Sequence, residues 1–147
     1  MTEKVTSRIG LDADAYKFDR DENLLELLSA KHSESQISCV MVDEAQFLTK
    51  DQVWQLGRIS DELDIPVLSY GLRSDFRGEP FEGSEYLLTW ADNLKEIKAI
   101  CHCGRKATMV LRVDESGEVV SDGAQVVIGD AQYRSVCRKH FAERVYE

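Results

Sequence analysis

Apolar and polar positions follow two different periods in the first half of the chain. Residues 37–42 form a short apolar run with β-branched side chains, which predicts a buried strand. Residues 51–64 carry apolar side chains about every 3.6 positions, which predicts an amphipathic helix ended by Pro66. A second apolar run at 67–70 predicts another buried strand. Strand, helix and strand with a short return form a βαβ unit, so we expect a parallel sheet.

Two further helices are predicted on either side of this unit. Leucines spaced along residues 23–31 predict an amphipathic helix, with Asp19 or Asp21 as its cap. Residues 85–94 predict another helix with Trp90 facing inward.

The pattern of apolar and polar residues changes after residue 96. Short β-like runs separated by Gly, Asp and Ser turn signals replace the helical periods. We therefore expect an α/β lobe over residues 1–95 and a small β-rich lobe over residues 96–147. The predicted strands of the second lobe are 99–100, 108–113, 126–128 and 133–136, with turns at 114–117 and 121–123.

Composition limits the classes of function. The 147 residues are 43% hydrophobic, enough for a core, and carry a formal net charge of −9, which disfavours binding to nucleic acid or anionic membranes. No apolar run approaches the roughly 18 residues of a membrane span. The first residues lack the apolar segment of a secretory signal. We expect a cytoplasmic protein whose cysteines stay reduced.

The cysteines predict a metal site. Three of the four lie late in the chain in two short groups, and a histidine follows the last of them by three positions. Two short loops with two ligands each can enclose a tetrahedral zinc, and a complete set of four protein ligands indicates a structural site. Cys39 stands apart in the run 37–42 and is expected in the core. The predicted ligands are Cys101, Cys103, Cys137 and His140, with His102 as an alternative to one of them.

Two carboxylates follow the first buried strand. Asp43 and Glu44 would lie at the carboxyl edge of the sheet, where α/β proteins bind ligands. There Asp43 could hold Mg²⁺, and Glu44 could take a proton from a substrate hydroxyl. The same dipeptide also suits a solvated turn that caps a helix. Gln46 and Phe47 favour a site, because a polar amide and an aromatic ring beside acids are typical of one.

Several segments together resemble the type II thymidine kinases, in the order and spacing of that family. The resemblance extends over nearly the whole chain, starting at residues 5–10. The segments are residues 43–47 (Asp-Glu-Ala-Gln-Phe), 70–78 (Tyr-Gly-Leu-Arg-Ser-Asp-Phe-Arg-Gly), the cysteine pair, 126–129 (Val-Val-Ile-Gly), Tyr133 and 137–140 (Cys-Arg-Lys-His).

The resemblance implies transfer of the ATP γ-phosphate to the 5′-hydroxyl of thymidine, a salvage step in DNA precursor synthesis. It implies an α/β fold with a P-loop-type parallel-sheet lobe and a small zinc-bearing lobe, and commonly a homotetramer. Glu44 would be the general base, with Asp43 and Gln46 on the side of Mg²⁺ and ATP. The zinc ligands match the four inferred above. The expected thymidine-binding residues are Phe47, Leu72, Phe76 and Tyr133, with the backbone of Val126, Val127, Ile128 and Gly129 reading the base edge.

One motif of that family is missing from the sequence. No G-x-x-x-x-G-K-[ST] phosphate loop occurs in the 147 residues. We expect an N-terminally truncated P-loop lobe that binds ATP poorly and turns over little by itself. Two alternatives follow, a zinc-stapled module that binds a nucleoside or nucleotide without phosphoryl transfer, and an inactive partner of a complete kinase.

Overall fold

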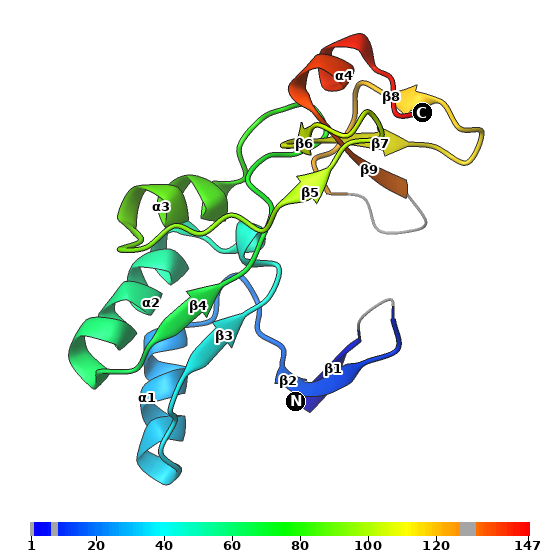
Figure 1. Cartoon of the computed structure of the whole chain (residues 1–147). Coiled ribbons are helices and arrows are strands. Elements are labelled where there is room, and N and C mark those ends of the chain that lie inside the picture. Colours follow the sequence, from blue (N-terminus) through cyan, green and yellow to red (C-terminus); the bar gives the residue numbers. More distant parts are fainter. Residues whose placement is uncertain (1, 7–8, 127–131) are drawn as a thin grey trace.

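The computed structural model describes residues 2–6, 9–126 and 132–147 (Figure 1). The helices are α1 (Leu24–Glu34), α2 (Lys50–Leu63), α3 (Glu82–Trp90) and α4 (Arg138–Glu143), with a 3₁₀ turn at Ala45–Phe47. The strands are β1 (Thr2–Thr6), β2 (Asp12–Tyr16), β3 (Val40–Val42), β4 (Val67–Ser69), β5 (Ala99–Ile100), β6 (Lys106–Ala107), β7 (Met109–Val113), β8 (Val119–Val120) and β9 (Gln132–Val136).

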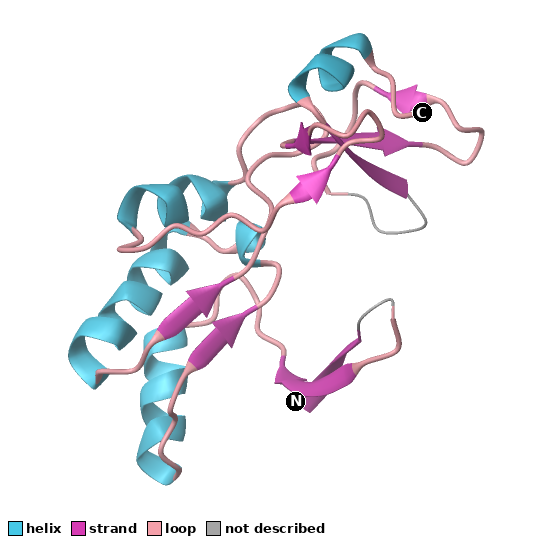
Figure 2. Cartoon of the chain, in the orientation of Figure 1, coloured by secondary structure: helices cyan, strands magenta, loops and turns pink. Residues whose placement is uncertain are grey.

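The predicted βαβ unit is confirmed, but its two strands are not buried as expected, since Met41 and Leu68 are exposed. β3 and β4 are parallel neighbours with Val40 opposite Val67, and α2 connects them. The helices α1 and α2 pack together beside the two strands (Figure 2). Their core includes Leu56 and Ile59, whose burial stabilises the fold by about 1.5–3 kcal/mol per side chain. The described part of this sheet has two strands, so a P-loop-type sheet remains a prediction.

Side chains at the helix starts explain where the helices begin. Asn23 caps α1 by accepting a hydrogen bond from the Glu26 N–H, so the prediction of an aspartate cap was wrong. Asn23 is closer to the first helical turn than either aspartate. Thr49 and Gln52 form a reciprocal capping box at the start of α2. Asp64 ends that helix in a left-handed conformation before Pro66 is reached.

The bounds of one helix and two further expectations about burial were wrong. Helix α3 begins three residues and ends four residues earlier than predicted, and its buried face is Gly83 and Ser84 against the 3₁₀ turn. Trp90 is consequently exposed and packs edge-on against Trp54 of α2, with ring centroids 5.2 Å apart. Cys39 precedes the short strand β3 and is exposed instead of forming part of the core.

The second half of the chain forms small antiparallel sheets. β8, β7 and β9 make a three-stranded sheet, and β5 pairs with β6. Two bonds close the predicted turn between β7 and β8: the Asp114 N–H donates to the Glu118 carbonyl, and the Gly117 N–H donates to the Asp114 carbonyl. Gly117 adopts a φ of 86°, which suits glycine. The core of this half contains Leu111 and Val136 beside two cysteines.

The N-terminal residues form a separate hairpin. β1 and β2 pair antiparallel, with Val5 opposite Ala13. Figure 1 shows this hairpin projecting from the layer of α1, α2, β3 and β4, and the β7–β9 sheet lying at the opposite end from α1. Within the described ranges, no helix is both long and apolar enough to cross a bilayer.

Candidate functional site

The two predicted carboxylates lie on a tight turn after β3. Glu44 has a left-handed backbone with φ 51° and ψ 37°, which is uncommon for a residue other than glycine. Its N–H donates to the Asp43 side chain at 2.9 Å. The Ala45 N–H then bonds to the Tyr70 carbonyl at 2.8 Å, fastening the turn to the end of β4. Both carboxylates are exposed at the carboxyl edge of the parallel pair, as predicted.

Gln46 lies directly behind this turn and is buried, with 2% of its surface exposed. Its Oε1 accepts from the Leu72 N–H at 3.1 Å, and its Nε2 donates to a Glu44 carboxylate oxygen. The backbone packs closely around it. A Cβ added to Gly71 would lie 2.6 Å from the Gln46 Oε1, and one added to Gly83 would overlap the Ala45 carbonyl oxygen. Glycine is therefore required at both positions.

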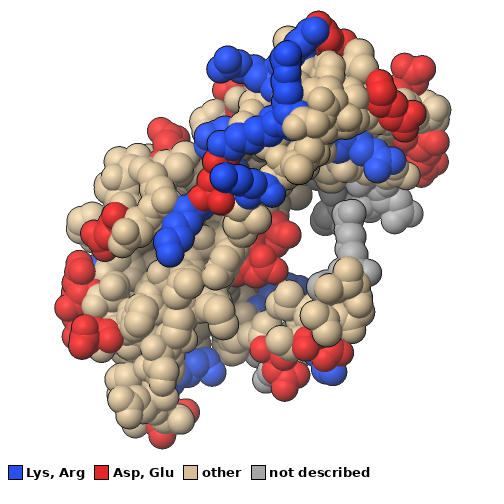
Figure 3. Space-filling model, viewed as in Figure 1, with Lys and Arg blue, Asp and Glu red and all other residues tan. Residues whose placement is uncertain are grey.

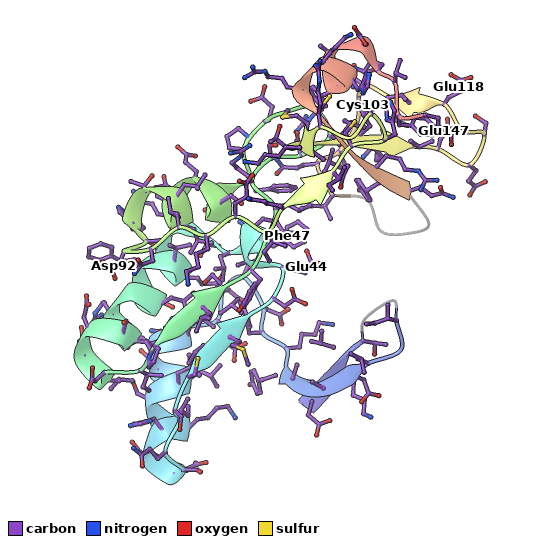
Figure 4. The ribbon with its side chains drawn as sticks, viewed as in Figure 1. Glu44, Phe47, Asp92, Cys103, Glu118 and Glu147 are labelled. Atoms are coloured by element: carbon purple, nitrogen blue, oxygen red, sulfur yellow. The ribbon has the colours of Figure 1, made fainter. Side chains whose placement is uncertain are left out.

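Phe47 is held through its backbone and its ring. Arg20 donates to the Phe47 carbonyl at 2.8 Å and forms an ion pair with Glu82 at 2.6 Å. A hydrogen bond from the Lys50 N–H is the main cause that lowers the pKa of the Glu82 carboxyl. The Phe47 ring meets Phe81 edge-on at 5.6 Å, which leaves part of Phe47 exposed beside Glu44 (Figure 4). Arg20 and Glu82 were missed, because they are 62 positions apart and follow no local pattern.

The other predicted thymidine-binding residues differ in accessibility. Leu72, Tyr133 and Val126 are exposed. Phe76 is only 1% exposed and lies under the Arg112 guanidinium, 3.7 Å from the ring centroid, so it offers no surface to a ligand in this conformation. The remaining residues of this predicted set, Val127, Ile128 and Gly129, lie outside the described residues.

A buried carboxylate joins the loop after β4 to the second half of the chain. Asp75 accepts from the Arg77 side chain at 2.8 Å and from the Gln125 amide at 3.1 Å. It also accepts from the backbone N–H groups of Arg77 and Glu79. Burial by itself raises the pKa of the Asp75 carboxyl, but these hydrogen bonds hold the pKa below its ordinary value. The carboxylate is therefore ionised in the fold at neutral pH.

The predicted metal ligands converge. Their four ligand atoms all lie within 4.8 Å of one another, with 3.9 Å between the Cys103 and Cys137 sulfurs and 3.2 Å between the Cys101 sulfur and His140 Nδ1. Tetrahedral zinc with bonds of about 2.3 Å to sulfur separates two sulfurs by about 3.8 Å, so the cluster fits a metal such as zinc. His102 is not one of the four converging ligands; its Nδ1 lies 3.6 Å from the Cys101 sulfur, and its ring stacks on the His140 ring.

The protonation of the thiols also suits a metal. Burial raises the pKa of the Cys101 thiol, but hydrogen bonds from His140 and neighbouring groups outweigh it and lower the pKa to about 5. The Arg105 N–H lowers the pKa of Cys103, yet burial and the adjacent sulfurs leave it raised overall. One thiolate is thus available at neutral pH, and a cation would favour ionisation of the others.

Comparison with known proteins places the sequence in one family. The model of a family described as thymidine kinase matches residues 1–141. A protein named thymidine kinase from Shewanella oneidensis is 58% identical over 145 residues, covering 98% of this chain and 76% of the relative. One from Photobacterium profundum is 59% identical over 143 residues, covering 97% and 74%. One from Escherichia coli O157:H7 is 56% identical over 141 residues, covering 95% and 69%.

The fold and the site together define an α/β protein with a carboxylate turn at a parallel sheet edge and a Cys₃His cluster that could hold a metal such as zinc. The chain belongs to the thymidine kinase family, and by that resemblance it is a kinase, a phosphotransferase.

Proposed function

We propose that this protein transfers the γ-phosphate of ATP to the 5′-hydroxyl of thymidine. The observation that carries the proposal is the family match over residues 1–141, which includes the exposed Asp43–Glu44 turn at the sheet edge. Phosphoryl transfer to a hydroxyl needs a positioned acceptor for the proton and a metal that neutralises the phosphates. The turn offers a carboxylate for each task.

Glu44 is the general base in this proposal. Its carboxylate accepts the proton of the 5′-hydroxyl as that oxygen attacks phosphorus. Asp43 is an exposed hard-oxygen ligand of the kind that Mg²⁺ prefers, and Mg²⁺ bound with ATP would offset the charge of the phosphates. Gln46, also expected on the Mg²⁺ and ATP side, is buried behind Glu44, which makes direct contact with Mg²⁺ a less favoured role.

The thymine base is proposed to lie against Phe47, Leu72 and Tyr133. All three are exposed apolar or aromatic side chains, and Phe47 is next to the carboxylate turn (Figure 4). A base needs flat apolar walls, and backbone groups supply the hydrogen bonds that select it. The stretch 126–129 retains this second role as a prediction, and Phe76 would support the wall from beneath.

Zinc in the Cys₃His cluster is proposed to be structural. The four protein ligands leave no position for a reacting water. The cluster joins the β5–β6 turn to the start of α4, in a part of the chain with a small core of its own. Closing that junction with a metal would stabilise the lobe proposed for residues 96–147.

A second candidate function is thymidine binding without turnover. The specific observation in its favour is that no G-x-x-x-x-G-K-[ST] segment occurs in the sequence, so a main source of phosphate contacts is missing from these residues. A regulatory or partner subunit with this property would hold the nucleoside and leave ATP unused.

One experiment separates the two functions. Thymidine binding to the chain is measured by calorimetry, and transfer of labelled γ-phosphate to thymidine is measured with Mg²⁺ and ATP, for the native chain and Glu44→Gln. Turnover that falls at least about a hundredfold in Glu44→Gln, with binding retained, supports the kinase. Binding of equal strength in both proteins, with no turnover detectable at saturating ATP, supports the second candidate. Absence of thymidine binding contradicts both.

The compartment and assembly are also proposals. The four cysteines are unpaired thiols, as expected in the cytoplasm. Lys and Arg side chains gather around α4 and β5–β6 in Figure 3. The whole sequence, however, has 27 Asp and Glu residues against 18 Lys and Arg, and this negative balance disfavours nucleic acid as a partner. Met41, Ile97 and Ile100 are each more than 70% exposed, which supports a homo-oligomer that covers them. Light scattering would give its mass.

A further inference from the structure

Gln46 connects the proposed base to the proposed thymine wall through one side chain. Its two polar ends make different contacts, with the backbone of Leu72 on one side and with the Glu44 carboxylate on the other. The side chain is buried, whereas Glu44 and Leu72 are exposed. A buried amide that reaches two exposed site residues is suited to fixing both.

The chemistry of the contacts sets the orientation of the amide. The Leu72 N–H can only donate, so the atom facing it at 3.1 Å must be the carbonyl oxygen Oε1. The NH₂ group is thereby directed at Glu44, which as a carboxylate can only accept. Gly71 and Gly83 leave no room for the turn to move away, since an added Cβ at either position would overlap it.

An exposed glutamate without such a contact would sample several rotamers. Ordering a free Glu side chain is entropically unfavourable, and a base that is misplaced by about 1 Å can lower a rate by about a hundredfold. A hydrogen bond to an ionised acceptor is stronger than a neutral one, and this donor is already fixed by its own burial.

We propose that Gln46 is a positioning residue that holds the Glu44 carboxylate in its reactive place and couples it to the Leu72 backbone. The proposal rests on the proposed function, because it assigns Glu44 the role of base. Gln46 acts through Glu44 and touches neither the hydroxyl nor the phosphate in this account.

The chain offers two informative substitutions and a matched control. Gln46→Glu keeps an acceptor for the Leu72 N–H, replaces the donor that faces Glu44 and adds an ionisable carboxyl group beside it. Gln46→Met keeps the size of the side chain and removes both contacts. Gln52 is the control: it is equally buried, accepts from the Thr49 N–H, and donates to backbone carbonyls away from the carboxylate turn. Gln52→Met therefore tests the loss of a buried glutamine by itself.

The kinetic test measures kcat and KM for thymidine at pH 8. We expect Gln46→Glu to lower kcat about 10- to 100-fold with KM changed less than about threefold, and Gln46→Met to alter both. Gln52→Met should leave kcat within about twofold. In a Glu44→Gln background, Gln46→Met should lower the residual kcat less than about twofold, because the residue acts through Glu44. Equal losses in both backgrounds, or a normal kcat in Gln46→Glu, would overturn the proposal.

A spectroscopic test on the same chain does not depend on turnover. The side-chain NH₂ of Gln46 is observed by ¹⁵N NMR in the native protein and in Glu44→Ala. We expect its protons to exchange with water at least about tenfold more slowly in the native protein than in Glu44→Ala. Equal exchange in the two proteins would overturn the positioning role. Slow exchange in a native chain that does not bind thymidine would refute the proposed function and leave the contact established.

Discussion

Replacing Asp75 by Asn should weaken the connection between the two halves of the chain. The Asp75 side chain is 1% exposed and accepts five hydrogen bonds. Its Oδ1 accepts from the backbone N–H groups of Arg77 and Glu79, and its Oδ2 accepts from the Arg77 guanidinium and the Gln125 amide. An Asn amide must present its NH₂ to one of these two sets, so at least two donors lose their acceptor and the charge is lost as well.

The expected loss follows from these contacts. Removing one partner of a buried ion pair costs about 3–5 kcal/mol, but the Arg77 side chain is 36% exposed and can regain water. We therefore expect the free energy of unfolding to fall by about 2–4 kcal/mol. For a domain of this size that lowers Tm by about 6–12 °C. Thermal and urea unfolding followed by circular dichroism would measure it at pH 7.

The contribution of the Asp75 carboxylate to stability depends on pH with a definite sign. The pKa of Asp75 is lower in the folded chain than its ordinary value of 3.8, so the carboxylate stabilises the fold above that value. The contribution disappears as the pH falls through the folded-state pKa. The difference in stability between native protein and Asp75→Asn should thus be constant near neutral pH and shrink below pH 3.8. A difference that grew on acidification would refute this reasoning.

The chain contains a control with the same turn. Asp114 accepts from the N–H groups of Ser116 and Glu118 just as Asp75 accepts from those of Arg77 and Glu79. Asp114 is exposed, so water can replace the lost acceptor. Asp114→Asn should shift Tm much less than Asp75→Asn. Equal Tm shifts in the two variants would mean that the turn itself, and not burial of the carboxylate, determines the loss of stability.

Further predictions concern the metal and the carboxylate turn. Metal analysis of the purified chain should give about one zinc per chain, and a folded chain with no zinc would refute the ligand set. His140→Ala should release the zinc and lower the Tm in thermal unfolding. Gly71→Ala should lower the free energy of unfolding by about 1–3 kcal/mol, because the new Cβ meets the Gln46 amide and backbone. Urea unfolding measures this loss, and an unchanged free energy of unfolding would contradict the packing argument.

The sequence predicted the elements that depend on local patterns. The βαβ unit follows from two apolar runs and one helical period, and the structure contains it. The Cys₃His cluster follows from ligand chemistry and spacing, and all four ligand atoms converge. The Asp114–Gly117 turn follows from its residues, and the same pattern recurs at Asp75–Gly78, so a search for that repeat would have identified Asp75.

Features set by tertiary packing were not predictable from local patterns. Trp90 satisfied a helical period, but α3 presents the small residues Gly83 and Ser84 to the 3₁₀ turn and turns the ring outward. The family resemblance predicts Phe76 in the thymine pocket, whereas the Arg112 guanidinium from β7 covers its ring in this structure. The contact between Arg20 and Phe47 joins distant residues and leaves no periodic signal.

This chain is proposed to phosphorylate thymidine with the Asp43–Glu44 turn as its reactive edge. The most direct measurement incubates the purified native chain with Mg²⁺, γ-labelled ATP and thymidine and separates the products. We expect labelled thymidine 5′-monophosphate and ADP in equal amounts, formed slowly because the 147 residues contain no G-x-x-x-x-G-K-[ST] segment, with the label missing when Glu44 is replaced by Gln. No labelled nucleotide from a folded chain that binds thymidine, or the same yield from Glu44→Gln, would contradict it.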